Sequence, residues 1–227
     1  ASRRTDIPAF YMDWFMEQIQ QGSFPIHNPF TRTVRKINLK AENIRTIVFW
    51  SKNFAPLIHS NAGRHLKNLG FDLYFNFTIN SESALLEPGV PPLADRLEQL
   101  AYLASQFGPQ HISWRFDPVC FFRTTLQSPV QHNLDGFESI AAHAADLGIK
   151  KCVTSFYDDY PKIQKRIQRL AGKNASIACF VPVSSHKKRQ IIQQMETQLA
   201  KTDIRLFLCC EKETFELLGP DTSVMEN

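Results

Sequence analysis

Short runs rich in β-branched and aromatic residues alternate along the chain with longer stretches of helical apolar spacing. Short apolar runs bounded by turn residues are typical of buried strands. The longer stretches carry apolar residues three and four positions apart, which is the repeat of an amphipathic helix. The alternation predicts parallel strands joined by crossover helices. The predicted strands cover residues 44–50 (IRTIVFW), 71–80 (FDLYFNFTIN), 111–116 (HISWRF), 151–156 (KCVTSF) and 204–209 (IRLFLC).

The helices follow from the same spacing, and glycines mark several of their ends. Gly22, Gly70 and Gly148 each come directly after a helical stretch, and glycine readily adopts the left-handed conformation that ends a helix. An edge hairpin is predicted within residues 24–39, and a further short extended piece over residues 177–181. The predicted helices cover residues 9–21, 54–69, 91–107, 129–147 and 185–201, with a strongly basic one over 160–171.

Five or six β/α units are therefore predicted within a single domain over residues 1–227. Right-handed crossovers of such units give either a barrel or an open doubly wound sheet. The chain contains neither a GxGxxG motif nor a P-loop, and these glycine-rich loops are typical of nucleotide-binding open sheets. We therefore expect an α/β, TIM-barrel-like fold, a partial (β/α) barrel of five to six or more parallel strands.

Composition narrows the class of protein. The net charge of +4 is mildly basic and lacks the strong bias of a dedicated nucleic-acid binder. No apolar stretch approaches the ~20 residues that cross a bilayer, so no membrane association is expected. The cysteines are odd in number and form no CxxC pair, which favours reduced thiols in a cytoplasmic protein over a disulfide framework or a zinc site. They are Cys120, Cys152, Cys179, Cys209 and Cys210.

The residues that follow the predicted strands are the candidate site, because ligands of parallel α/β proteins bind at the carboxyl ends of the strands. Alternation puts Arg115 and Asp117 on one face of their strand, and a charge facing the helix layer would be costly unless paired. We expect catalytic roles for Asp6, Lys52, Arg115, Asp117 and Glu211. We expect substrate-binding roles for Arg3, Arg4, Ser51, Asn76, Thr78 and Ser155.

Two chemistries suit this set of residues. The cations Arg3, Arg4, Lys52 and Arg115 would form a positive pocket for a carboxylate or phosphate, and so for a small-molecule or anionic substrate. The carboxylates would balance that charge, bind a hard metal ion or act as acid and base. A salt-bridge network that closes the mouth of the barrel is the alternative to a site.

Two further functions stay open at this stage. A metal-assisted lyase or hydrolase would use Asp6, Asp117 and Glu211, although the sequence contains no HxH or HExxH motif and predicts no specific metal site. A non-catalytic nucleic-acid-binding domain would use the basic segments at residues 162–169 and 187–189. The sequence indicates neither the substrate nor the oligomeric state.

Several motifs, in order, resemble an uncharacterised bacterial family, domain of unknown function 1848. The opening at residues 2–10 (SRRTDIPAF) is the most specific of them. The others are residues 28–30 (NPF), 47–53 (IVFWSKN), 74–78 (YFNFT), 90–93 (VPPL), 114–118 (WRFDP), 155–156 (SF) and 210–211 (CE). The resemblance spans nearly the whole chain and weakens between about 157 and 200.

The resemblance implies more than the family name states. Members of the family usually continue to a cysteine-rich end with a CxxxCxxC-like run, which is similar to the iron–sulfur ligands of radical S-adenosylmethionine barrel enzymes. This sequence contains no such run, so either this member lacks the cluster or the chain is truncated before the run, and we expect the second. The resemblance therefore implies an enzymatic barrel domain in which S-adenosylmethionine and a [4Fe-4S] cluster would bind only in a longer chain.

Overall fold

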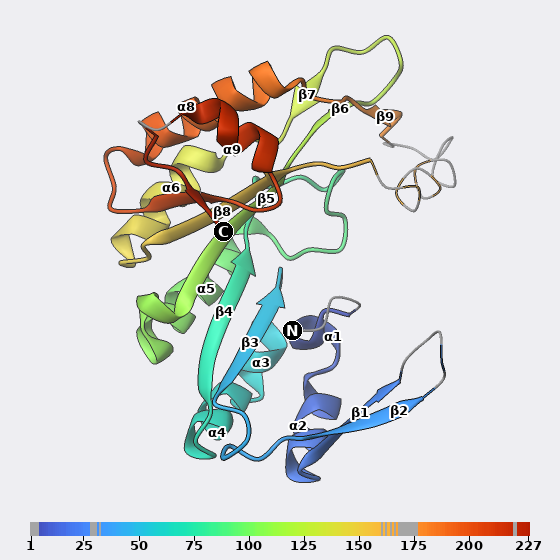
Figure 1. The fold of residues 1–227 in the computed structure, drawn as a ribbon, viewed down its shortest axis with the longest axis vertical. Helices are drawn as coiled ribbons and strands as arrows, with labels where there is room; N and C mark the ends of the chain where they lie inside the picture. Colours follow the sequence, from blue (N-terminus) through green and yellow to red (C-terminus); the bar gives the residue numbers. More distant parts are fainter. Residues whose placement is uncertain are drawn as a thin grey trace. The chain divides into compact units, whose positions relative to one another are not determined.

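The structure is a computed structural model that describes residues 5–27, 31, 33–159, 161, 163, 165, 167, 177–219 and 222–227. The chain divides into two compact units, residues 1–77 and 78–227. We call them the first and second units and describe each by itself (Figure 1).

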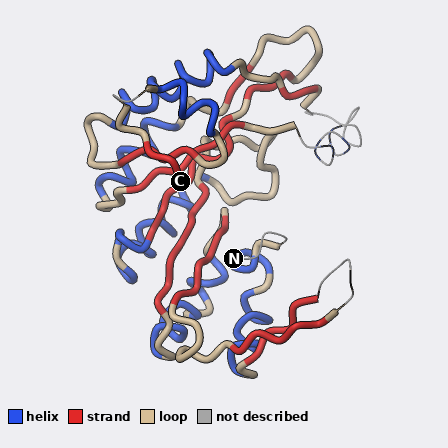
Figure 2. The backbone as a smooth tube through the Cα atoms, viewed as in Figure 1, coloured by secondary structure: helices blue, strands red, loops and turns tan. Residues whose placement is uncertain are grey.

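The first unit pairs its strands in two ways. Strands β1 and β2 form an antiparallel hairpin, which confirms the hairpin predicted within residues 24–39 (Figure 2). Strands β3 and β4 pair in parallel, with Thr46 opposite Asp72 and Ser51 opposite Phe77. In chain order the elements are α1 (Ile7–Phe10), α2 (Met12–Gln20), β1 (Ser23–His27), β2 (Val34–Asn38), β3 (Thr46–Ser51), α3 (Ala55–His59), α4 (Ala62–Asn68) and β4 (Asp72–Thr78), whose last residue belongs to the second unit.

Phenylalanines form the core of the first unit. Phe49 and Phe75, from the paired strands, stack with ring centroids 6.0 Å apart. Phe54, just before α3, packs edge-on against Phe75 at 5.6 Å and Phe77 at 4.8 Å. Phe15 of α2 meets Phe49 at 5.7 Å. Edge-on and offset contacts of this kind stabilise aromatic cores beyond the area they bury.

Two helices predicted as continuous in the first unit are interrupted. The helix predicted over residues 9–21 breaks at Tyr11, whose φ of −137° and ψ of 25° are not helical. The apolar spacing from which that helix is predicted includes Phe10 and Trp14, yet Phe10 is 74% exposed and Trp14 is 39% exposed, with its ring against Phe24. The helix predicted over residues 54–69 breaks at Asn61, which takes the left-handed conformation between α3 and α4. Asparagine tolerates that conformation better than most residues.

The second unit carries a parallel sheet in the order β5-β8-β10-β11 and a small antiparallel sheet in the order β7-β6-β9. The parallel strands confirm the α/β class, but the pairings within either unit form no closed barrel among the described residues. The elements are α5 (Leu93–Phe107), the short 3₁₀ turn η1 (Pro109–His111), β5 (Ile112–Val119), β6 (Phe121–Arg123), β7 (Gln131–His132), α6 (Phe137–Asp146), β8 (Lys151–Phe156), β9 (Cys179–Phe180), α8 (Ser185–Leu199), β10 (Arg205–Leu208), α9 (Lys212–Leu218) and β11 (Met225–Glu226).

Helices cover one face of this parallel sheet. Trp114 and Phe116 of β5 both contact Phe137 of α6, with ring centroids 5.3 and 5.1 Å apart. Helix α8 packs against α6, α9 and β10 (Figure 1). Because side chains alternate along a strand, Arg115 and Asp117 point to the opposite face. The prediction that these two charges avoid the helix layer is therefore consistent with the packing of β5.

The helix predicted over residues 129–147 begins later than expected. Residues 131 and 132 form β7, in which Gln131 lies opposite Phe122 of β6, and α6 starts only at Phe137. Backbone pairing with β6 thus replaces the first turns of the predicted helix. The basic helix predicted over residues 160–171 lies largely outside the described residues. Among the described helices, none combines the length and apolarity needed to cross a bilayer.

Candidate functional site

The carboxyl ends of β5 and β8 hold a charged cluster inside the second unit. Arg115 donates from Nε and Nη2 to Oδ2 of Asp117, at 3.1 and 2.7 Å. The Ser155 hydroxyl, on the neighbouring strand, donates to the other carboxylate oxygen, Oδ1. The Arg115 side chain is 4% exposed and that of Asp117 is 16% exposed. Three residues predicted from the sequence are therefore in direct contact, and the carboxylate retains access to solvent.

Asn80, two residues after β4, fixes the backbone at Asp117. Its Oδ1 accepts from the Asp117 amide at 2.8 Å, and its Nδ2 donates to the Asp117 carbonyl at 3.2 Å. The same Nδ2 donates to Oε1 of Glu87 at 2.8 Å. The peptide bond between Asp117 and Pro118 is cis. One amide side chain thus holds both polar backbone groups of the residue that carries the carboxylate.

A buried ion pair lies behind Asn80. Arg96 of α5 is 1% exposed, and its Nη1 donates to the Asn80 carbonyl at 3.3 Å and lies 3.6 Å from Oε2 of Glu87. Burial lowers the pKa of Arg96, and the charge of Glu87 opposes that shift. A buried cation of this kind is stable in a fold only when paired. The pair therefore connects α5 to the residue that holds Asp117.

Glu211 has a different environment from Asp117. Its Oε1 accepts from the Phe156 amide at 2.9 Å, and its Oε2 accepts from Lys188 Nζ at 2.8 Å and from the Thr214 hydroxyl at 3.2 Å. The residue is 8% exposed. Its carboxylate therefore joins the end of β8 to α8 and to the first turn of α9. These contacts indicate a structural role, and the catalytic role predicted for Glu211 stays a prediction.

The small antiparallel sheet contacts the end of β8 through aromatic rings. Tyr157 stacks on Phe180 of β9, with ring centroids 4.1 Å apart. Burial is the largest cause and a hydrogen bond to Asp159 the second, and together they raise the pKa of Tyr157 to about 12. At the end of β5, Asn133 Nδ2 donates to the Pro118 carbonyl at 2.9 Å. The cluster of Arg115, Asp117 and Ser155 is thus bordered by residues that contact the ends of both β5 and β8.

The first unit brings together three other predicted residues. Asp6 accepts the Ala9 amide on Oδ1 at 3.0 Å, as the cap of α1. Its Oδ2 accepts from the Ser51 hydroxyl at 2.8 Å and from the Lys52 amide at 3.4 Å. Both of the latter lie at the carboxyl end of β3. The Asp6 carboxylate therefore serves local structure, and the catalytic and substrate-binding roles expected for Asp6, Ser51 and Lys52 stay predictions.

The remaining predicted residues are less informative. Asn76 is half-buried on β4, opposite Trp50, and Thr78 is buried at the end of the same strand. Arg3 and Arg4 lie outside the described residues. The predicted common cavity draws on residues of both units and stays a prediction.

The metal and nucleic-acid alternatives gain no support from the described residues. Within those ranges no three His, Cys, Asp or Glu side chains form a group that could hold a metal ion. Of the basic segments, Lys162, Arg166 and Arg169 lie outside the description, and Lys188 is paired with Glu211. Both alternatives therefore stay predictions from the sequence.

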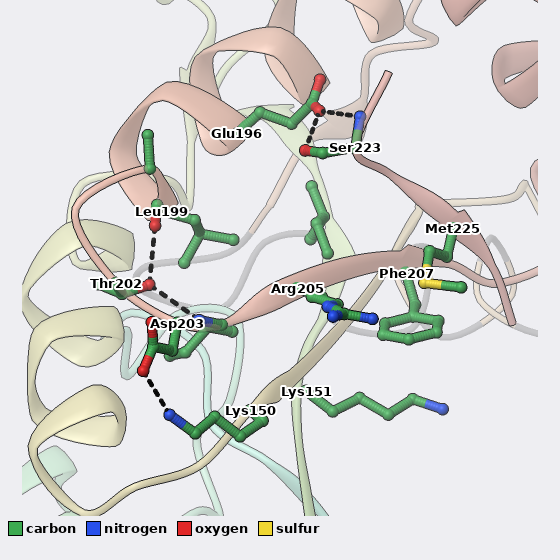
Figure 3. Close-up of a pocket in the computed structure, with 13 residues that line it drawn as sticks. Lys150, Lys151, Glu196, Leu199, Thr202, Asp203, Arg205, Phe207, Ser223 and Met225 are labelled. Atoms are coloured by element: carbon green, nitrogen blue, oxygen red, sulfur yellow. Dashed lines mark hydrogen bonds and ion pairs between the residues drawn. The ribbon is translucent and has the colours of Figure 1, made fainter. Parts of the chain in front are cut away.

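A hollow of about 850 Å³ lies at the opposite, amino-terminal ends of β8 and β10 (Figure 3). Lys151 and Arg205, the first residues of these strands, are partners in the parallel register. Lys151 Nζ lies 4.3 Å from the ring centroid of Phe207. Burial lowers the pKa of Lys151, and the positive charge of Arg115 lowers it further. Lys150 pairs with Asp203 at 2.6 Å on the rim.

Of the residues that support Asp117, the sequence points only to Asn80, as one of the polar side chains at a strand end together with Asn76 and Thr78. It singles out neither Glu87 nor Arg96. Arg96 left a usable signal, because it falls on the buried stripe of α5 that continues through Leu100 and Leu103. An arginine on an apolar helical stripe must be paired if it is buried. Glu87 lies in a loop and left no comparable signal.

Comparisons with known proteins show the family and little more. A family model described as "Domain of unknown function (DUF1848)" matches residues 1–224. No curated protein matches. Solved structures similar to this chain include a dihydropyrimidinase from Brevibacillus agri NCHU1002, with 12% identity and a TM-score of 0.35. A D-hydantoinase has 13% identity and a TM-score of 0.34, and a D-hydantoinase from Bacillus sp. AR9 has 11% and 0.34.

These structural likenesses are weak and partial. The chain spans 34% of the length of each of the three proteins, and 74 to 75% of the chain is covered. The family match confirms the resemblance drawn from the opening motif. A relationship to radical S-adenosylmethionine proteins is not shown by these comparisons and stays a prediction.

Proposed function

This chain belongs to the DUF1848 family, and we propose that its second unit is an enzymatic domain that binds a small polar substrate at the carboxyl ends of β5 and β8. The observation that carries the proposal is the way the Asp117 carboxylate is held. Arg115 and Ser155 contact its two oxygens from two strands, while the side chain stays 16% exposed. Binding groups held rigidly by their neighbours are typical of functional sites.

The arrangement favours a substrate that carries a hydrogen-bond donor or a positive charge. The cation of Arg115 is already neutralised by Asp117 at 2.7 Å, so it is poorly placed to bind a separate anion. A carboxylate oxygen has more than one acceptor site, and the exposed part of Asp117 can accept a further N–H or O–H group. The proposal therefore changes the expected substrate from an anion to a polar donor.

The residues have distinct roles in this proposal. Asp117 contacts the substrate, and Arg115 and Ser155 orient its carboxylate. Asn80 fixes the backbone of Asp117 through both its amide and its carbonyl group. Parallel α/β folds place their ligands at these strand ends, which supports assigning the cluster to function. A purely structural ion-pair network is the competing explanation that the experiment has to exclude.

The test is a thermal-shift screen of the full chain against small polar metabolites with amine, amide, guanidine or hydroxyl groups. Binding to the native state raises the unfolding midpoint, because the ligand stabilises that state by RT ln(1 + [L]/Kd). We expect at least one compound to raise the midpoint of the wild type and to lose that effect in Asp117→Asn, which keeps the shape of the side chain and removes its charge. Circular dichroism would verify that the variant is folded.

A matched control is available at the other end of the sheet. Asp203→Asn removes an exposed carboxylate that pairs with Lys150, and this variant should respond to the compound as the wild type does. A compound that stabilises Asp117→Asn as much as the wild type would count against the proposal. So would a screen in which no compound of these classes shifts the midpoint.

A further inference from the structure

Two cysteines lie next to each other at the carboxyl end of β10. The Sγ atoms of Cys209 and Cys210 are 3.9 Å apart. Cys210 is exposed and Cys209 is half-buried, whereas Cys120 and Cys152 are buried. Burial further raises the pKa of Cys152, which keeps that thiol protonated and unreactive. The adjacent pair therefore contains the most accessible thiol of the chain.

The backbone at this pair is unusual and fixed on both sides. Cys210 has a φ of +61°, in the left-handed region that non-glycine residues rarely adopt. On one side, the Cys209 amide donates to the Thr154 carbonyl at 2.9 Å. On the other, Glu211 is held by the Phe156 amide and by Lys188. Backbone conformations of this kind cost energy and occur preferentially at functional sites.

We propose that Cys209 and Cys210 form a reactive dithiol that hydrogen peroxide oxidises to a reversible disulfide. The thiolate of the exposed Cys210 attacks one peroxide oxygen, which breaks the O–O bond and gives a sulfenic acid and water once the leaving hydroxide is protonated. The Cys209 thiolate then attacks the Cys210 sulfur, and hydroxide leaves as a second water. Two thiols and one peroxide thus give one disulfide and two waters, and the two cysteine sulfurs are oxidised as the peroxide is reduced.

Geometry makes this disulfide a labile one. Adjacent Cα atoms are about 3.8 Å apart, which is shorter than the usual separation of about 4.4–6.8 Å in disulfides. The sulfurs must also close from 3.9 Å to about 2.05 Å. Strained, exposed disulfides are easily reduced and are typically regulatory or catalytic. The bond therefore forms and opens next to Glu211, which ties β8 to α8.

The experiment is intact-mass analysis of the reduced full chain after treatment with equimolar hydrogen peroxide. We expect a loss of the mass of two hydrogen atoms, a fall of two in the free-thiol count, and full reversal by dithiothreitol. Trypsin cuts after Arg205 and Lys212, and the peptide between them, residues 206–212 (LFLCCEK), holds both cysteines and no other. The mass loss should lie in this peptide.

Two variants separate the proposal from general thiol oxidation. Cys210→Ser should lose the two-hydrogen change and instead accumulate oxygen on Cys209 or remain unmodified. Cys179→Ser removes another half-buried thiol and should retain the change. The proposal is overturned if the two-hydrogen loss maps to another pair of cysteines or persists in Cys210→Ser. Direct addition of oxygen to Cys210 in the wild type, without a disulfide, would overturn it as well.

Discussion

Charged side chains at the carboxyl ends of β5 and β8 are paired inside the protein, whereas cations at the amino ends of β8 and β10 lie side by side. Arg115 is bound to Asp117, and Lys188 to Glu211. At the other end, Lys151 and Arg205 are register partners on neighbouring parallel strands. Opposite charges close together attract and like charges close together repel one another.

The two ends also differ in how firmly their polar groups are held. Asp117 is fixed by contacts from β5, β8 and the segment after β4. The hollow at the amino ends is wide, at about 850 Å³, but its best-defined ion pair joins the exposed Lys150 and Asp203. Exposed pairs contribute little to stability. The size of a hollow and the organisation of its polar groups are therefore separate properties, and the second is the better guide to function here.

The largest effect is expected from removing the cation behind Asn80. Arg96→Met leaves Glu87, whose side chain is 9% exposed, without its paired charge, and breaking a buried pair costs about 3–5 kcal/mol. Urea denaturation of the full chain would measure the loss. The double variant Arg96→Met with Glu87→Gln removes both charges and should recover part of it. A loss below about 1 kcal/mol for the single variant would show that the ion pair of Arg96 and Glu87 stabilises the fold less than its contacts indicate.

A matched pair of serines gives a sharper test of the comparison. Ser155 at the carboxyl end of β8 donates to Asp117, whereas the buried hydroxyl of Ser113, near the start of β5, has no hydrogen-bond partner among the described residues. Ser155→Ala should cost about 1 kcal/mol or more, while Ser113→Ala should be neutral or stabilising. Equal losses for the two variants, measured by urea denaturation, would contradict the difference drawn between the two ends.

The sequence predicted the strands and one face of the site better than it predicted the support behind that site. Alternation alone put Arg115 and Asp117 on the same face of β5, because a strand repeats every two residues. Alternation also grouped Asn80 with Asn76 and Thr78. The contacts of Asn80 and Glu87 could not be predicted in this way, because they depend on how a loop folds back over the strand ends. Loops carry no periodic signal from which such contacts can be predicted.

The helix errors have a common physical cause. Apolar spacing predicted one helix over residues 9–21. In the structure the helix breaks at Tyr11, and the buried apolar side chains of α2 are Met12, Phe15 and Ile19. Spacing also predicted a helix from residue 129, but there the backbone of Gln131 forms a strand that pairs with β6. Helix α1, before the break, packs against α3 and β3. Tertiary contacts therefore form in both places, and local preference is too weak to compete with them.

The smallest effect is expected at the amino ends of the strands. Lys151→Met removes a partly buried cation that burial and the charge of Arg115 disfavour, and it should raise stability by at most about 1 kcal/mol at neutral pH. In the wild type the pKa of Lys151 is lowered by burial and then by Arg115, so the unfolded chain binds this proton more tightly than the folded one. The free energy of unfolding of the wild type therefore rises as the pH increases from the lowered pKa of Lys151 toward the ordinary lysine pKa. Chemical denaturation between neutral and alkaline pH should show the stability advantage of Lys151→Met shrinking over that interval. A constant advantage would mean that it comes from the apolar methionine side chain and not from removal of the positive charge.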